Sequence, residues 1–257
     1  MALPRVIPIL LLRNKGLVKS IRFKDHKYIG DPINTVKILN EKEVDELAFI
    51  DIDASRENRE PNYQLLSEIA SECFMPLAYG GGVSSLKQIR ILIQSGIEKI
   101  IINHHALVNP GFVKSAIDAF GSSTIVGAMD IKKNFFGSYQ VYTHVGTKSL
   151  SKDAVTYAES LEALGVGELL VNNVDLDGMM SGYDLSIVKK IAEAVDIPVI
   201  ACGGAGTVDD IDRVINQANA SAAGAGSMFV YRGKHRAVLI TYPEYKILNE
   251  IFRKKKP

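Results

Sequence analysis

The chain has 257 residues, of which 47% are hydrophobic, 23% charged and 7% aromatic. This balance is typical of globular domains and excludes disordered, collagen-like and disulfide-rich chains. Thirty basic and twenty-nine acidic residues leave a net charge of +1. Because the charges nearly balance, the chain has no long-range electrostatic field that would attract nucleic acid or an anionic membrane. We therefore expect neither as a partner.

Two cysteines, Cys73 and Cys202, lie in apolar stretches. Two such residues favour buried thiols of a reduced, cytoplasmic protein over a disulfide. The apolar run from Val6 to Leu12 is bounded by Arg5 and Arg13, and it is too short for a membrane span or a signal peptide. We therefore expect a buried strand at this position and a cytoplasmic location.

Short apolar runs alternate with longer amphipathic stretches, a pattern typical of strand–helix units around a parallel sheet. The runs lack polar alternation, as expected where both strand faces are buried. The eight predicted strands are Val6–Leu11, Leu47–Asp51, Leu77–Tyr79, Lys99–Asn103, Thr124–Asp130, Leu169–Asn173, Val199–Cys202 and Ala222–Ala225. Helix start signals stand at Asp31-Pro32, Ser84-Ser85, Asn109-Pro110, Ser151, Asp184 and Thr207, and a last helix is expected from about Pro243 into the basic residues 253–256.

No linker rich in Gly, Ser or Pro divides these units. Eight units in this length predict a closed (β/α)8 TIM barrel, with residues 1–257 as a single domain. Val44-Asp45-Glu46-Leu47 resembles Val166-Gly167-Glu168-Leu169, an offset of 122 residues. The same offset relates Pro76 to Pro198, Gly81 to Gly203, and Gly82 to Gly204. This repeat predicts a barrel built of two homologous half-barrels.

Glycine-rich turns follow the third, seventh and eighth predicted strands and should meet at one rim. Glycine lets a phosphate approach backbone N–H groups, and short helices opening after strands seven and eight would point their N-termini at the anion. One such cluster is equally typical of a tight turn, but two at symmetric positions predict a ligand with two phosphates. The expected contacts are Gly81, Gly82 and Asn103 on one side, and Gly203, Gly204, Gly226 and Ser227 on the other.

Aspartates at strand ends are the natural acids and bases of such a barrel, because its C-terminal rim gathers them around a ligand. Asp130, which ends the fifth strand, is the best candidate. Lys19 either holds a phosphate, or steadies a loop, or is a solvated surface residue. Loop capping explains the other strand-end aspartates equally well; these are Asp51, Asp53, Asp175 and Asp177. No metal or cofactor is expected.

Eight motifs are spread over nearly the whole chain: Arg5-Val6-Ile7-Pro8, Gly30-Asp31-Pro32, Asp45-Glu46-Leu47, Gly80-Gly81-Gly82, Asp130, Asp175-Leu176-Asp177-Gly178, Gly182-Tyr183-Asp184 and Ala201-Cys202-Gly203-Gly204-Ala205-Gly206. Together they resemble the cyclase subunit of imidazole glycerol phosphate synthase. The resemblance implies a (β/α)8 barrel that takes ammonia from a separate glutaminase subunit and uses it at the rim to split and cyclise a bisphosphorylated ribonucleotide. Lys19, Asp177 and Gly178 join the expected substrate-binding set.

In that family an aspartate ends strand one and works with the aspartate that ends strand five, whereas this chain has Leu11 at the first position. Asp130 therefore lacks its partner. Chemistry in which one carboxylate gives a proton and another takes one cannot be run by Asp130 and Leu11. Asn172 replaces a threonine-like residue, and His104 and His105 stand where smaller residues are usual.

Four charged residues at the N-terminal ends of the strands gate the ammonia passage in that family, and all four are present as Arg5, Glu46, Lys99 and Glu168. A ring of this kind would alternatively stabilise the bottom of the barrel. With the gate retained, we expect a glutaminase subunit to dock on the N-terminal face, with Glu98 and Lys99 near the contact.

The leucine-rich first strand, Phe74-Met75-Pro76 and Gly233–Leu239 are similar to a subgroup of this family from bacterial surface-polysaccharide gene clusters. That resemblance implies a subunit that channels ammonia, together with a glutaminase-like protein and a third, amidotransferase protein, for acetamidino sugars of lipopolysaccharide. Three alternatives remain open: an authentic cyclase of histidine biosynthesis, a sugar-phosphate isomerase, and a non-enzymatic scaffold that binds a phosphorylated metabolite. Leu11 counts against the first two.

Overall fold

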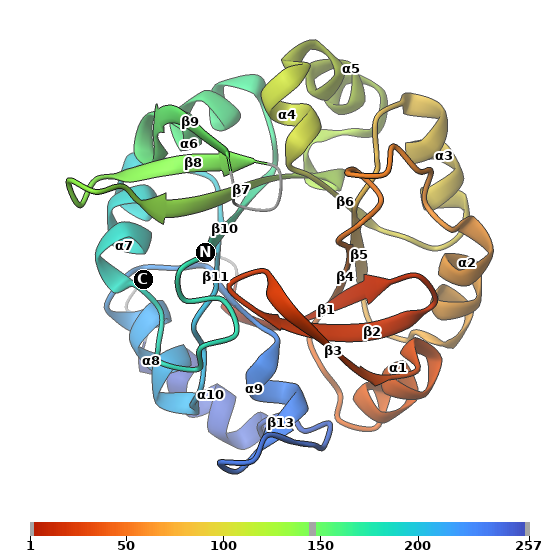
Figure 1. The fold of residues 1–257 in the computed structure, drawn as a ribbon, viewed down its shortest axis with the longest axis vertical. Helices are drawn as coiled ribbons and strands as arrows, with labels where there is room; N and C mark the ends of the chain where they lie inside the picture. The colour runs from red at the N-terminus through yellow and green to blue at the C-terminus, as the bar shows by residue number, and fades with distance from the viewer. Residues whose placement is uncertain (1–2, 144–147, 255–257) are drawn as a thin grey trace.

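Eight parallel strands close into a barrel in the computed structural model, which describes residues 3–143 and 148–254 (Figure 1). The barrel strands are β1 (Arg5–Arg13), β4 (Leu47–Asp51), β5 (Leu77–Gly80), β6 (Lys99–Ile102), β7 (Ile125–Lys133), β10 (Glu168–Asn173), β11 (Val199–Cys202) and β12 (Ala222–Ala225). Pairing of β12 with β1, from Arg5 opposite Ala222 to Pro8 opposite Ala225, closes the sheet. The predicted fold and all eight predicted strands are confirmed.

Helices form an outer ring around these strands (Figure 1). They are α1 (Pro32–Asn40), α2 (Tyr63–Glu72), α3 (Leu86–Gln94), α4 (His104–Val108), α5 (Pro110–Phe120), the 3-10 turn η1 (Ser122–Thr124), α6 (Ala154–Leu164), α7 (Leu185–Ala194), α8 (Val208–Asn216), α9 (Ser227–Val230) and α10 (Tyr245–Lys254). Asp31, Ser85, Asn109 and Thr207 cap helices with their side chains as predicted.

Two details of the helix prediction are wrong. Asp153, not Ser151, caps α6, because its carboxylate accepts the backbone N–H groups of Val155 and Thr156. No short helix follows β11 among the described residues; the chain runs directly into α8, and only α9 opens after β12. The last helix, expected from about Pro243 into the basic residues, is confirmed as α10, which begins at Tyr245; residues 255–256 lie outside the described residues.

Two antiparallel extensions of the sheet were not predicted. Beyond the barrel, β1 pairs with β2 (Gly16–Ile21), which pairs with β3 (Lys24–Gly30). Likewise β7 pairs with β8 (Tyr139–Thr143), which pairs with β9 (Lys148–Asp153). A small pair, β13 (Tyr231–Arg232) and β14 (Ala237–Val238), follows α9. The two large extensions leave strands one and five, and both lie over one end of the barrel (Figure 1).

The two half-barrels repeat each other in local structure. Ser85 and Gln88 form a capping box at α3, and Thr207 and Asp210 form one at α8. The two boxes are separated by the offset of 122 residues that the sequence repeat shows. A local hydrogen-bond pattern that recurs at this spacing supports two homologous halves.

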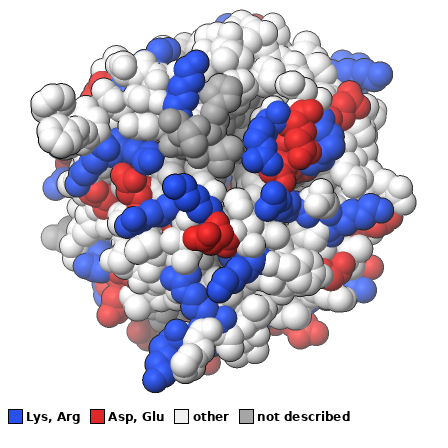
Figure 2. Space-filling view, viewed as in Figure 1, with Lys and Arg blue, Asp and Glu red and all other residues white. Residues whose placement is uncertain are grey.

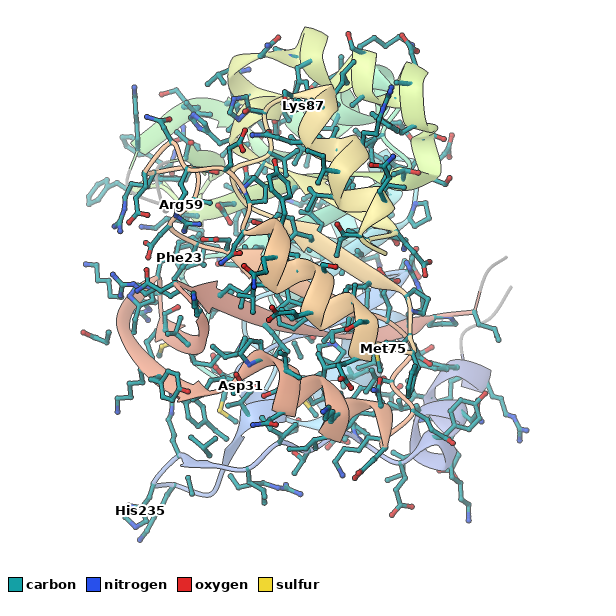
Figure 3. The ribbon with its side chains drawn as sticks, turned by 90° about the vertical axis from the view of Figure 1, so that its right-hand side faces the viewer. Phe23, Asp31, Arg59, Met75, Lys87 and His235 are labelled. Carbon is teal, nitrogen blue, oxygen red and sulfur yellow. The ribbon has the colours of Figure 1, made fainter. Side chains whose placement is uncertain are left out.

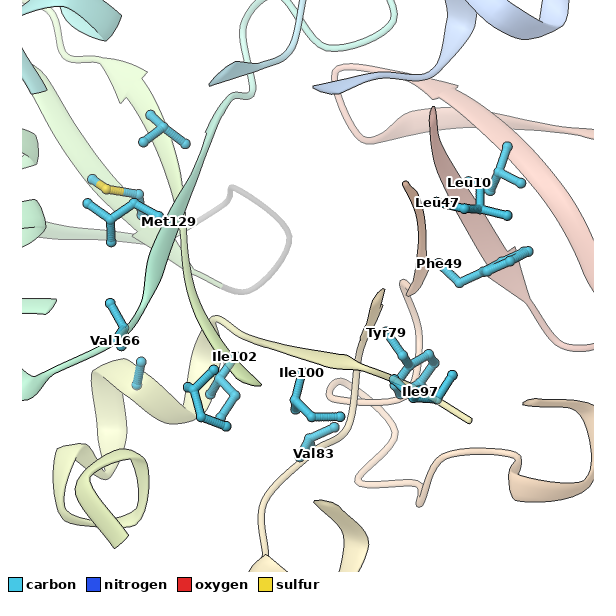
Figure 4. Close-up of a cluster of buried hydrophobic side chains, with 14 of the residues drawn as sticks. Leu10, Leu47, Phe49, Tyr79, Val83, Ile97, Ile100, Ile102, Met129 and Val166 are labelled. Atoms are coloured by element: carbon cyan, nitrogen blue, oxygen red, sulfur yellow. The ribbon is translucent and has the colours of Figure 1, made fainter. Parts of the chain in front are cut away.

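The core has an outer and an inner part. Leu10, Phe49 and Tyr79 belong to the outer part, where buried side chains pack between the strands and the helices (Figure 4). The inner part fills the barrel itself with Ile7, Ile9, Ala48, Ala78, Ile101, Val126, Ala128, Leu170, Ile200 and Ala222. Among the described residues, no helix has the length and hydropathy required to cross a bilayer.

Candidate functional site

A cavity of about 360 Å³ opens at the C-terminal ends of the barrel strands. Its lining includes Leu11, Asn103, Asp130, Asn172 and Asp177. Phe23 of the β2–β3 turn and Arg59 lie at this end of the molecule, whereas Met75 lies at the opposite end (Figure 3). Lys and Arg side chains are numerous on this face, with acidic side chains among them (Figure 2).

Asp130 is held at the cavity wall by two neutral amides. Asn103 Nδ2 donates to its Oδ2 at 2.9 Å, and Asn172 Nδ2 donates to its Oδ1 at 3.1 Å. Burial raises the pKa of Asp130 to about 6, although the two amide donors oppose this shift. The carboxyl is therefore mostly ionised at neutral pH and still able to take up a proton.

Strand β1 provides no second carboxylate to this cavity. Leu11 is half-buried and packs with the inner core. The neighbouring Arg13 donates to Asp53 at 2.9 Å, and Arg56 binds the other oxygen of Asp53. These contacts give Asp53 a structural role as a loop anchor.

The carboxylate of Asp51 is also bound by an arginine, because Arg59 donates to both of its oxygens at 3.1 Å. Asp175 lies beside β7, where its carboxylate accepts the backbone N–H of Lys133 at 3.2 Å. Of the strand-end aspartates, Asp130 and Asp177 remain as cavity-lining groups that are not held by an arginine in the described structure.

Lys19 is 5% exposed, so it is not a solvated surface residue. Its Nζ donates to the backbone oxygen of Ile9 at 2.5 Å and faces Asp177. Burial lowers the pKa of Lys19 to about 8, against the opposing effect of Asp177. A second pocket surrounds this lysine, and its lining includes Gly178, Gly203, Gly204, Gly226 and Ser227. The structure thus brings the expected contacts of strands six to eight together around one buried cation.

On the other half-barrel the expected donors are already used. The Gly82 N–H donates to Ser55 Oγ at 3.1 Å, and Asn103 binds Asp130. A Cβ atom at Gly81 would lie 2.4 Å from the Asp51 carbonyl oxygen, and one at Gly203 would lie 2.4 Å from that of Asn173. These glycines are therefore needed for close packing of neighbouring loops, whether or not a phosphate binds.

At the opposite end of the barrel, the four predicted gate residues form one closed ring. Arg5 binds Glu46 and Glu168, and Lys99 Nζ lies 3.0 Å from each of the same two carboxylates. Glu46 and Glu168 are only 4% and 6% exposed. Burial opposes the charge of Arg5, but the two carboxylates keep its pKa above the ordinary value. We call this set the charged ring.

The unpredicted extensions add cavity residues that the sequence analysis missed, namely Ser20, Phe23, His26 and Thr143. Thr143 Oγ1 lies 2.9 Å from Nδ1 of His104, which also lines the cavity. No alternation of apolar and polar residues marks Lys24–Gly30, so a sequence pattern could not have placed them. Within the described ranges, no group of three or more His, Cys, Asp or Glu side chains could hold a metal ion.

A cavity at this rim is where TIM barrels hold their substrates, and the fold and site together define a barrel of that class. Residues 5–236 match the family described as histidine biosynthesis protein. The chain belongs to this family, among the HisF-type subunits of imidazole glycerol phosphate synthase. The cyclase family expected from the sequence is confirmed.

Three relatives illustrate this membership. The Pseudomonas aeruginosa protein, provisionally named imidazole glycerol phosphate synthase subunit hisF2, is 48% identical over 245 residues, which cover 95% of this chain and 98% of that relative. A Leptospira borgpetersenii protein with a similar provisional name is 46% identical, covering 93% and 95%. The imidazole glycerol phosphate synthase subunit HisF of Alkaliphilus metalliredigens is 40% identical, covering 88% and 90%.

Proposed function

We propose that the chain is a cyclase-like, ammonia-channelling subunit of a glutamine-dependent amidotransferase complex that serves sugar amidination in lipopolysaccharide biosynthesis. The observation that carries the proposal is the contrast between the two ends of the barrel. The charged ring is complete, whereas the rim cavity is lined by Asp130 on β7 and by Leu11, not a second carboxylate, on β1. Delivery of ammonia is therefore retained, and the paired-carboxylate chemistry of the rim is not.

The barrel interior suits the passage of neutral ammonia. Above the charged ring, the axis is surrounded by apolar side chains, among them the small Ala48, Ala78 and Ala222. An ammonium ion would lose its hydration there without gaining a counter-ion, so only the uncharged molecule should enter. The charged ring, in which two cations face two carboxylates, would leave no net charge to hold an ammonium ion at the entrance, so the nitrogen source would pass as ammonia.

The nitrogen source in this proposal is a glutaminase subunit on the N-terminal face. Relatives are named as subunits of a synthase, which supports a multi-subunit assembly. Phe74, 86% exposed, and Leu3, 76% exposed, lie outside the barrel on the segments that precede β5 and β1. Such exposed apolar side chains are typical of a protein interface. A third, amidotransferase protein would use the ammonia.

A phosphorylated ligand at the rim is part of the proposal. Buried Lys19 and the backbone around Gly178, Gly203, Gly204, Gly226 and Ser227 would hold a phosphate, because they combine a cation with closely approachable N–H groups. Gly81, Gly82 and Asn103 would contribute a second site only if their present internal contacts are exchanged for ligand contacts.

The alternative function is that of an authentic cyclase of histidine biosynthesis, which converts ammonia and a bisphosphorylated ribotide to imidazole glycerol phosphate and an aminoimidazole carboxamide ribotide. Asp130, Lys19 and Asp177 meet at the rim as that activity would require. The name of the Alkaliphilus relative is consistent with it.

The purified chain, supplied with ammonium and the bisphosphorylated ribotide, distinguishes the two functions. Since Asp130 has no carboxylate partner on β1, we expect turnover roughly 10²- to 10⁴-fold below that of a paired-carboxylate site. Leu11→Asp should recover part of it, whereas Leu11→Asn, of similar size and without charge, should not. Wild-type turnover of about 10 per second would overturn the proposal and return the protein to histidine synthesis.

A further inference from the structure

Two phenylalanines at the tip of the β7–β8 hairpin are exposed to solvent almost completely. Phe135 is 98% exposed and Phe136 is 88% exposed. Their rings stack edge to face, with centroids 5.6 Å apart. Large aromatic side chains in this state are rare on a protein surface unless another surface covers them. Neither residue lines the rim cavity or contacts the charged ring.

The tip is rigid, so the two rings are presented in a fixed orientation. Asn134 Oδ1 accepts the backbone N–H groups of Phe136 and Ser138 at 2.9 and 3.0 Å. The Asn134 N–H donates to the Ser138 carbonyl oxygen at 2.8 Å, and Gly137 completes the turn at a φ of +81°. At the base of the hairpin, the Tyr139 hydroxyl donates to Asp184, the residue before α7. Pre-organisation of this kind lowers the entropic cost of binding.

The hairpin and the strand that follows it carry more basic than acidic side chains. Residues 132–153 contain four lysines and one aspartate, whereas the whole chain has a net charge of +1. Lys133 and Lys152 are exposed, and Asp153 pairs with Gln140, which places Lys152 toward the tip end of β8. The Lys133 ammonium forms an ion pair with the Asp184 carboxylate at 3.5 Å, whereas Lys152 forms no ion pair among the described residues. The tip is therefore aromatic and flanked by exposed lysines.

We propose that this tip docks the protein on an anionic lipid bilayer, with Phe135 and Phe136 inserted at the interface and Lys133 and Lys152 near the headgroups. Aromatic side chains favour the membrane–water interface, and neighbouring lysines add attraction to anionic lipid. Membrane binding of this kind combines two weak contributions, here the insertion of aromatic side chains and the attraction of lysines to anionic lipid. Figure 1 shows the hairpin reaching past the ring of helices, so the barrel does not block its approach to a surface.

The size of the apolar patch favours a bilayer over a protein partner. Two phenylalanine side chains offer roughly 300 to 500 Å², and the flanking Asn134, Gly137 and Ser138 are polar or small. A specific protein interface needs about 800 Å² on each partner, with further apolar residues around its anchor. A bilayer accepts a small wedge, because lipids rearrange around it.

Co-sedimentation of the full chain with vesicles tests this proposal. The probes are vesicles of phosphatidylethanolamine with phosphatidylglycerol, compared with vesicles of phosphatidylcholine alone. We expect binding to the anionic vesicles that weakens with added salt. Phe135→Ser with Phe136→Ser should lower the partition coefficient by about tenfold or more, since the inserted apolar area is removed.

Matched variants keep the result interpretable. Phe74→Ser removes an equally exposed phenylalanine from a distant segment and should leave vesicle binding unchanged. Lys133→Gln with Lys152→Gln should weaken binding to anionic vesicles alone. Absence of vesicle binding, or binding that the tip variants do not change, would overturn the proposal. So would sedimentation equilibrium showing that the tip joins two copies of the chain, with the serine variants remaining monomeric.

Discussion

At the scale of single residues, two neutral amides set the properties of Asp130. Each donates its Nδ2 to a different carboxylate oxygen, and their own Oδ1 atoms are buried without a hydrogen-bond partner in the described structure. Burial dominates the resulting balance, so the pKa of Asp130 rises to about 6. A carboxyl with this pKa costs stability when it is ionised, which is typical of functional sites.

The first prediction follows from this shift. In the unfolded chain the Asp130 pKa is about 4, and in the folded protein it is about 6. Stability from this group is therefore present below pH 4 and is lost as the pH rises through 6. Asp130→Asn should be more stable than wild type at pH 7 by about 1 to 3 kcal/mol, a difference that should fade near pH 4.

Urea denaturation of both proteins at several pH values measures this difference. The substituted amide can donate to Asn103 or Asn172 once one of these side chains turns its oxygen toward it. If Asp130→Asn were destabilised equally at every pH, ionisation of Asp130 would not be the cause of the stability difference.

At the scale of elements, the two capping boxes mark equivalent places in the two halves. Thr207 accepts the Asp210 N–H at 3.3 Å, and Asp210 accepts the N–H groups of Gly206 and Thr207 at 3.0 and 2.9 Å. Asp210 also binds Arg213 and is 5% exposed. Gln88 accepts the N–H groups of Ser84 and Ser85 in the same way, so the α8 box differs from the α3 box by its added contact with Arg213.

The second prediction concerns these caps. Ser85→Ala and Thr207→Ala should each lower the free energy of unfolding by about 1 kcal/mol, because one backbone N–H loses its acceptor. Asp210→Ala should cost about 2 kcal/mol or more, since the N–H groups of Gly206 and Thr207 and the Arg213 guanidinium lose their acceptor together. Thermal and chemical unfolding measure both effects, with Glu159→Ala on the exposed side of α6 as a control. Equal effects of Thr207→Ala and Asp210→Ala would contradict the assigned role of Asp210.

The strands and most helix starts could be predicted because their signals are local. Apolar runs between Asp31-Pro32, Ser85 and Thr207 specify buried strands and capped helices directly. The two hairpins could not be predicted this way, because their pairing is with the ends of β1 and β7 and not with a local hydrophobic pattern. Ser151 illustrates the limit at a helix start, since Asp153 two residues later makes the capping bonds.

The site was predictable where a residue's role depends on its place on a strand. Asp130 and Leu11 reach the cavity because they lie at the ends of barrel strands. The sequence did not reveal that Arg59 and Arg13 bind Asp51 and Asp53, nor that Lys19 is buried. Arg13 and Asp53 come from separate segments, and Arg59 reaches Asp51 only through the fold of the loop after β4, so no local sequence pattern specifies these contacts.

At the scale of the whole molecule, the charged ring and the rim cavity lie at opposite ends of one apolar interior. The ring is neutral overall, since two cations face two carboxylates. Pairing every charge keeps the desolvation cost of this partly buried ring low. It also leaves no net charge to hold an ammonium ion. The composition of the ring is thus compatible both with a stable barrel and with the passage of ammonia. A single substitution can distinguish these two roles.

Lys99→Met is that substitution. It leaves Glu46 and Glu168 buried with Arg5 as their shared cation, so we expect a loss of about 3 kcal/mol in unfolding free energy. The net negative ring should also retain ammonium at the entrance. In the complex with a glutaminase, whose interface should bury roughly 1,200 to 2,000 Å², ammonia delivered per glutamine hydrolysed should fall while the reaction driven by added ammonium is kept.

Lys99→Arg preserves the charge and serves as the control, and assays well below the unfolding temperature of the Met variant separate conduction from stability. The two readouts have different physical origins, because stability depends on the compensation of buried carboxylates, whereas delivery depends on which protonation state of the nitrogen enters the apolar interior. A stable complex whose glutamine-driven reaction is indifferent to Lys99→Met and to Glu46→Gln would assign the charged ring to barrel stability alone. It would also remove the main support for a conduit through this barrel.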